Sequence, residues 1–124
     1  MMRVGFTYDL REDYRAMGYG EDAIAEFDSP ETIAEIEAAL RRLGFAVERI
    51  GHVKALVARL VAGARWDIVF NIAEGLAGRS REAQVPALLE AYDIPYVFSD
   101  PLTLAVGLDK AVAKQVAQAA GIAA

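Results

Sequence analysis

The chain has 124 residues, which suits one domain of ordinary size, and its 55% apolar and 25% charged content is typical of a globular fold rather than a disordered chain. Eighteen acidic against 13 basic residues give a formal net charge of -5, which disfavours a nucleic-acid backbone or an anionic membrane as the main partner. The chain has no cysteine, which excludes a disulfide framework and a thiol nucleophile, and its single histidine, His52, argues against a conventional zinc enzyme.

The chain contains no apolar stretch of the length that a membrane-spanning helix requires. Its first residues, Met1 to Val4, lead directly into a strand pattern rather than a signal peptide. The sequence therefore predicts a cytoplasmic protein without membrane contact.

In the first half of the chain, residues 3–8 predict a strand, because Val4, Phe6 and Tyr8 alternate with Gly5 and Thr7. No period holds through residues 9–28, which predict a long loop with a helical turn near 22–27. Ser29 followed by Pro30 predicts a helix start, since serine caps free amides and proline is tolerated at the first helical position. The apolar stripe expected on this helix, before its end at Gly44, is Ile33, Ile36, Leu40 and Leu43.

Residues 45–50 predict a second, more polar strand at a sheet edge. A helix should follow, with His52 at its start and Gly63 at its end. Its expected inward stripe is Val53, Leu56, Val57, Leu60 and Val61. Residues 66–71 form a mostly continuous apolar run, which indicates a strand buried on both faces of a parallel sheet.

The remaining pattern predicts a glycine-bearing loop over 72–80 and a helix over 82–92, with Pro86 early enough to be tolerated. A short strand over 94–98 follows, then a helix from Ser99 to about Gly107 and a last helix over 110–120. This alternation predicts a single three-layer, Rossmann-like α/β domain: a parallel sheet of about four strands in the order 2-1-3-4, with helices on both faces. Reversal of strand order between the first and third strands would put a crevice over loops 9–28 and 72–80.

The usual nucleotide motifs are missing, since neither a G-x-G-x-x-G nor a Walker loop is present. A phosphorylated receiver domain would need an aspartate where Asn71 stands. Within 74–82, Arg79 and Arg81 could bind a carboxylate or phosphate, or could simply pair with Glu74 and Glu82 on an exposed turn.

Two further sets of charged residues could have a function or could simply be exposed to solvent. The acidic residues of the first crevice loop could meet an amine or a metal ion, or could be solvated; they are Glu12, Asp13 and Asp22. Lys110 and Lys114 lie one turn apart, as on an ordinary solvated helix face.

The second half of the chain resembles the amino-terminal domain of D-alanine:D-alanine ligase and related ATP-grasp ligases. The resemblance runs in order and spacing through VFNIAEG (69–75), REAQVPALLE (81–90), IPY (94–96), SDP (99–101), LDK (108–110) and GI (121–122). It implies that residues 1–124 form a pre-ATP-grasp domain, to be completed by central and carboxy-terminal domains that clamp ATP. It also implies the reaction: ATP phosphorylates a carboxylate, and an amine attacks the acyl phosphate, with magnesium shielding the phosphates.

The same resemblance implies roles for particular residues. Lys110 matches the family lysine that reaches the nucleotide phosphates, and Glu74, Gly75 and Arg79 match a loop near the bound substrates. D-alanine ligases commonly carry His-Gly where this chain has Glu74-Gly75. Their Glu-Val-Ser motif after the first strand is not reproduced, although Glu12 could serve in its place. The resemblance therefore implies an amide or peptide ligase for an amino-acid-like substrate, with D-alanine itself left open.

Several expectations follow for the chain alone. It should be inactive without the other domains, binding no ATP or magnesium tightly, and it could form a homodimer, as family members often do through this domain. Two rival interpretations stay open: a stand-alone binding or interaction domain without catalysis, and a small-molecule sensor whose ligand lies over Asp9 and Glu74.

Overall fold

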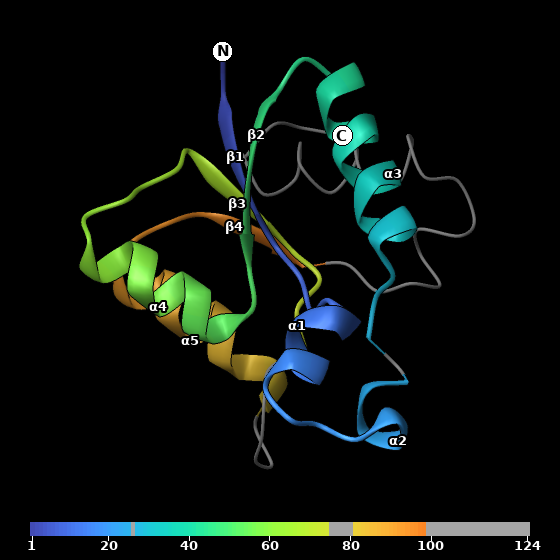
Figure 1. Ribbon diagram of the computed structural model, residues 1–124. Helices are drawn as coiled ribbons and strands as arrows, with labels where there is room; N and C mark the ends of the chain where they lie inside the picture. Colours follow the sequence, from blue (N-terminus) through green and yellow to red (C-terminus); the bar gives the residue numbers. More distant parts are fainter. Residues whose placement is uncertain (26, 75–80, 99–124) are drawn as a thin grey trace.

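The computed structural model describes residues 1–25, 27–74 and 81–98. Within them lies a four-stranded, fully parallel sheet in the order β2-β1-β3-β4 (Figure 1). The strands are β1 (Arg3–Thr7), β2 (Ala46–Gly51), β3 (Ile68–Asn71) and β4 (Tyr96–Phe98). The predicted fold class and strand order are confirmed, including the edge position of β2.

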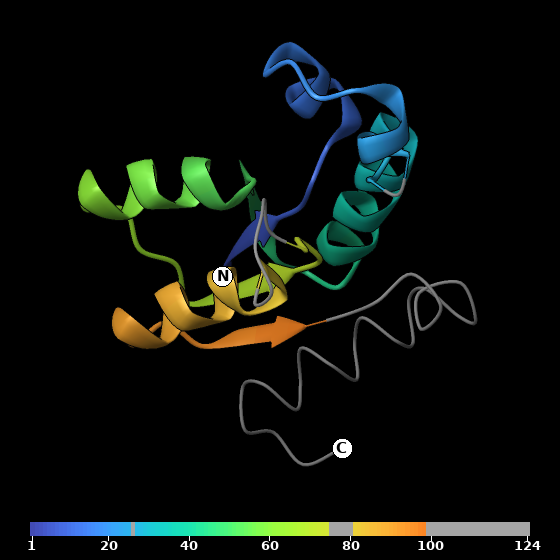
Figure 2. The same ribbon diagram turned by 90° about the horizontal axis from the view of Figure 1, so that it is seen from below.

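Helices cover both faces of the sheet, as predicted. The longer helices are α3 (Pro30–Arg42), α4 (Val53–Val61) and α5 (Gln84–Ala91), the last preceded by a 3₁₀ turn over Arg81–Ala83. Seen along the sheet, α3 lies on one side, whereas α4 and α5 lie together on the other (Figure 2). This arrangement gives three layers, helix on sheet on helix.

The core between α3 and the sheet is built from one face of each element. Its fully buried members include Val4, Phe6, Ile33, Leu40 and Phe70. The predicted start of α3 is confirmed, since the Ser29 hydroxyl accepts a hydrogen bond from the Thr32 amide at 3.3 Å. Leu43, however, is 37% exposed, because α3 has ended by that point.

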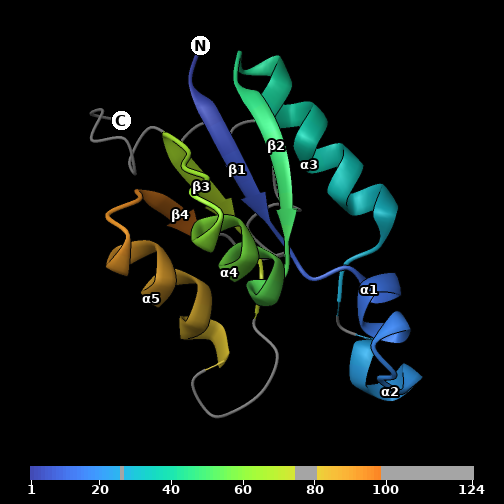
Figure 3. The same cartoon turned by 60° about the vertical axis from the view of Figure 1, so that its left-hand side comes forward.

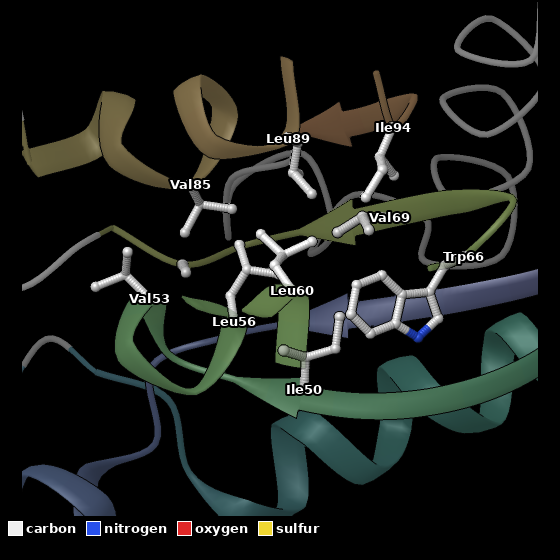
Figure 4. Packing of buried hydrophobic residues seen from close by; sticks show 10 residues of the cluster. Ile50, Val53, Leu56, Leu60, Trp66, Val69, Val85, Leu89 and Ile94 are labelled. Carbon is white, nitrogen blue, oxygen red and sulfur yellow. The ribbon is translucent and has the colours of Figure 1, made fainter. Parts of the chain in front are cut away.

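The second core lies between the sheet and the pair α4 and α5 (Figure 4). The residues that fill it are Ile50, Val53, Leu56, Leu60, Trp66, Val69, Ala73, Val85, Leu89 and Ile94. The prediction that Val57 and Val61 face inward is wrong: they are 41% and 77% exposed. Val53, Leu56 and Leu60 form the inward stripe. Val57 follows Leu56 by one residue and Val61 follows Leu60 by one residue, so each lies about 100° round the helix from that buried leucine.

Gly5 allows this second core to close against β1. A Cβ atom at Gly5 would lie 2.6 Å from Ile50 Cδ1 and 3.0 Å from the Trp66 ring. Glycine therefore permits the indole to approach the strand closely, where a Cβ atom would push it away.

The prediction of a long loop over residues 9–28 is wrong in part, because residues 11–16 are helical; the helical turn predicted near 22–27 overlaps a second short helix. The segment contains α1 (Arg11–Ala16) and α2 (Glu21–Ile24). These two short helices pack around a small core of their own, made of Tyr14, Ile24 and Phe27. The Tyr14 and Phe27 ring centroids are 4.3 Å apart. The segment is thus a separate packed unit rather than an extended loop.

Within the described residues, no helix is long and apolar enough to cross a membrane. The helices predicted over 99–107 and 110–120 lie outside the described residues.

Candidate functional site at the carboxyl edge of the sheet

Strands β1 and β3 are neighbours and end at the same level, because Thr7 pairs in register with Asn71. The chain segments that follow them therefore meet at one edge of the sheet. Helices α1 and α2 lie just beyond the arrowheads of β1 and β2 (Figure 3). This is the edge over which the crevice was predicted, at the point where the strand order reverses.

Asp9 is the central residue of this edge and is only 1% exposed. Its Oδ2 atom accepts a hydrogen bond from the Glu74 amide at 2.5 Å, and its Oδ1 atom accepts one from the Tyr14 hydroxyl. Its backbone carbonyl also accepts a hydrogen bond from the Asp28 amide at 2.8 Å. One residue thus joins the end of β1 to α1, to the approach to α3 and to the segment after β3.

Tyr14 contributes its hydroxyl from a fully buried position on α1. Burial raises the pKa of this phenol far above its ordinary value, and the hydrogen bond to Asp9 raises it further. The phenol therefore stays protonated and serves as a permanent donor to Asp9. Its ring also packs edge-on against the imidazole of His52, with centroids 5.8 Å apart.

Asp28 adds a second carboxylate next to Asp9. Its burial raises the pKa of the Asp28 carboxyl to about 6, and the negative charges of Asp9 and Glu74 act in the same direction. Arg11 opposes the shift only partly. The guanidinium of Arg11 instead donates its Nε hydrogen to the Phe27 carbonyl at 2.7 Å. Asp28 therefore lies beside two negative charges whose effect Arg11 offsets only in part.

A neutral pair lies below this acidic group, inside the sheet. Thr7 Oγ1 donates a hydrogen bond to Asn71 Oδ1 at 2.8 Å. Asn71 Oδ1 also accepts a hydrogen bond from the Ala73 amide at 2.9 Å. Both side chains are completely buried. Among the described residues, the Asn71 Nδ2 atom has no hydrogen-bond partner. These bonds fix how the chain leaves β3 and turns toward Glu74.

Of the residues predicted to bind substrate or nucleotide, Glu74 is part of this edge through its amide. Glu12 lies exposed in the first turn of α1. Gly75, Arg79 and Lys110 lie outside the described residues.

The other charged residues singled out in the sequence cap a helix or lie exposed on the surface. His52 has the expected capping role, since its Nδ1 atom accepts from the Ala55 amide at 3.3 Å. Asp22 is exposed on α2, and Arg81 and Glu82 are exposed in the 3₁₀ turn before α5.

The joint role of Asp9, Tyr14 and Asp28 was not predicted from the sequence. For Asp9 the sequence contains one indication of a role at this site, because an aspartate directly after a buried strand lies at the edge where α/β folds bind ligands. For Tyr14 and Asp28 it contains none, because their contact with Asp9 depends on how the α1–α2 segment folds back.

The described residues do not fit a magnesium site. Among residues 1–25, 27–74 and 81–98, no group of three or more His, Asp or Glu side chains is arranged to hold a metal ion. Both carboxylate oxygens of Asp9 are engaged by protein donors. We therefore assign no metal-dependent step to this edge.

Comparison with known proteins identifies relatives for about two thirds of the chain. A D-alanine--D-alanine ligase of Sinorhizobium fredii is 43% identical over 84 residues, covering 68% of this chain and 26% of the relative. Ligases of the same name from Sinorhizobium medicae (41% over 86 residues; 68% and 26%) and Xanthomonas axonopodis pv. citri (38% over 78 residues; 63% and 24%) are also similar. The chain is homologous to the amino-terminal domain of D-alanine--D-alanine ligases.

The homology confirms the resemblance inferred from the sequence motifs, and it favours a ligase domain over a stand-alone interaction domain. The chain spans about a quarter of the length of these relatives. No family model matches the chain, and no solved structure matches it.

Proposed function

We propose that residues 1–124 form the amino-terminal domain of an ATP-dependent carboxylate–amine ligase acting on amino-acid-like substrates. The observation that carries this proposal is the 43% identity with a D-alanine--D-alanine ligase over 84 residues. The parallel sheet supports it, because the segments after β1 and β3 meet at the edge where α/β folds bind small molecules.

In this proposal the chain supplies part of the amino-acid side of the site. Glu74 and the following Gly75 and Arg79 contact the substrate, with Glu12 as a further candidate contact. Lys110 binds the nucleotide phosphates. ATP and magnesium are bound mainly by further domains, so residues 1–124 alone bind ATP weakly and are inactive.

The chemistry to be tested is formation of an acyl phosphate. The carboxylate oxygen attacks the γ-phosphorus of ATP and releases ADP; the amine then attacks the acyl carbon, and phosphate leaves with that oxygen. An amino acid labelled with oxygen-18 in its carboxylate should therefore transfer one labelled atom to inorganic phosphate. We expect the protein at its native length to produce ADP, an amide and labelled phosphate from a panel of D- and L-amino acids, measured by mass spectrometry. ADP with unlabelled phosphate would contradict the proposal.

Lys110 and Lys114 offer a matched pair of variants, since both are lysines predicted on one helix. We expect Lys110→Ala to raise the KM for ATP strongly because a phosphate-binding charge is lost. Lys114→Ala should leave the KM for ATP near that of the unaltered protein. Equal effects of the two substitutions would refute the role given to Lys110.

We also propose a second copy of this domain as a partner, as the family resemblance implies. Light scattering on the protein at its native length tests this: a dimer mass supports it, and a monomer mass at micromolar concentration contradicts it.

A further inference from the structure

We propose that Asp9 is a positioning residue of the amino-acid site, holding the Glu74 segment in place for substrate. The inference rests on the proposed function and deepens it, because Glu74 begins the loop to which that function assigns substrate contacts. It concerns a residue outside the motifs that carry the family resemblance.

The geometry of Asp9 suits this role. Its carboxylate is almost fully buried and engages donors from two separate segments, Tyr14 on α1 and the Glu74 amide after β3. Glu74 is 65 residues away in sequence, so this bond fixes the Glu74 backbone against the segment that follows β1. The Glu74 amide and the Asp9 oxygen are 2.5 Å apart, so the contact is a close one.

The anchoring of Asp9 is also directional. The backbone bond from the Asp28 amide holds the main chain of Asp9 beside the end of β1, so its Oδ2 atom stays directed at the Glu74 amide whether or not Tyr14 binds the other oxygen. Asn71 anchors the residue immediately before Glu74, because its Oδ1 atom accepts a hydrogen bond from the Ala73 amide. Ala73 and Glu74 are therefore held at two successive amides by buried side chains, a rigid arrangement that suits Glu74 to orient a substrate.

Three substitutions separate positioning from general stability. Asp9→Ala removes both hydrogen bonds. Asp9→Asn keeps the shape: its oxygen can accept from the Glu74 amide while its amide group donates to the Tyr14 oxygen, which reverses that bond. Tyr14→Phe destabilises the same buried group but leaves the bond to Glu74 in place.

The experiment measures steady-state kinetics of the protein at its native length, with the KM for the amino acid and for ATP determined separately. We expect Asp9→Ala to lower kcat/KM for the amino acid about 10- to 100-fold, with the KM for ATP unchanged. Asp9→Asn should recover most of this loss, and Tyr14→Phe should change kcat/KM less than about threefold. If Tyr14→Phe lowers kcat/KM as much as Asp9→Ala, the effect is one of stability and the inference fails.

A second readout does not depend on activity. Amide hydrogen exchange followed by NMR should show the Glu74 amide protected in the unaltered protein, in Tyr14→Phe and in Asp9→Asn, and unprotected in Asp9→Ala. An unprotected Glu74 amide in the unaltered protein would overturn the inference even if Asp9→Ala does not fold. Absence of ligase activity with a protected Glu74 amide would instead refute the proposed function while leaving the role of Asp9 in fixing the segment intact.

Discussion

Substitution of Asp28 by asparagine should stabilise the protein at neutral pH. The pKa of Asp28 is raised from 3.8 to about 6 by burial and by the charges of Asp9 and Glu74. The folded protein therefore binds this proton more tightly than the unfolded chain does. The stabilising contribution of the protonated Asp28 carboxyl to the free energy of unfolding is fully present below pH 4 and is lost as the pH rises through 6.

The magnitude follows from the size of the shift. Two pKa units correspond to about 3 kcal/mol. Asp28 is only half-buried, so solvent screening reduces this to about 1–2 kcal/mol. Asp28→Asn removes the charge that is unfavourable above pH 6, and we expect it to raise the free energy of unfolding by that amount at pH 7.5 and to leave it nearly unchanged at pH 3.5.

Urea unfolding of residues 1–124, followed by fluorescence of the buried Trp66, measures this difference at the two pH values. Asp22→Asn is the matched control, since Asp22 is an exposed aspartate in the same segment and its replacement should change stability equally little at both pH values. A gain for Asp28→Asn that is the same at pH 3.5 and 7.5, or a loss at pH 7.5, would refute the electrostatic reasoning.

Four further substitutions test the packing and one helix cap. Gly5→Ala should destabilise the protein by about 1–3 kcal/mol in the same unfolding assay, because its Cβ would collide with Ile50 and the Trp66 ring; an unchanged midpoint would contradict the close approach. Ser29→Ala should cost about 1 kcal/mol through loss of the α3 cap, and a change below a few tenths of that would show that the cap does not contribute. Leu60→Ala should cost about 2–5 kcal/mol, whereas Val61→Ala should stay within about 0.5 kcal/mol; similar losses would show that both face the core.

Much of the fold could be predicted because its signals are local. The alternation of β-branched strands with amphipathic helices indicates a parallel sheet. Ser29, Gly44 and Gly63 mark helix ends through capping and positive φ, and the structure has φ of +94° at Gly44 and +91° at Gly63. The inward stripe of α4 was drawn too wide, because valine at 57 and 61 suggested burial although the sheet covers a narrower arc of the helix.

The α1–α2 segment and the site were harder to predict for a common reason. Tyr14 precedes Ile24 and Phe27 by ten residues or more and lies on a different helix, so no single helical stripe joins it to them, and the three come together only when the α1–α2 segment folds back on itself. The bond between Asp9 and Glu74 joins residues 65 positions apart, and no spacing rule reports such a pair. Position at the end of a strand could indicate where the site lies, but not which side chains hold it together.

Formation of an amide from amino acids and ATP by the protein at its native length tests the central claim most directly. The account predicts one ADP for each amide formed, with neither product when residues 1–124 are assayed by themselves. A protein of native length that forms no amide with any member of the amino-acid panel, or that releases ADP without a coupled product, would contradict it.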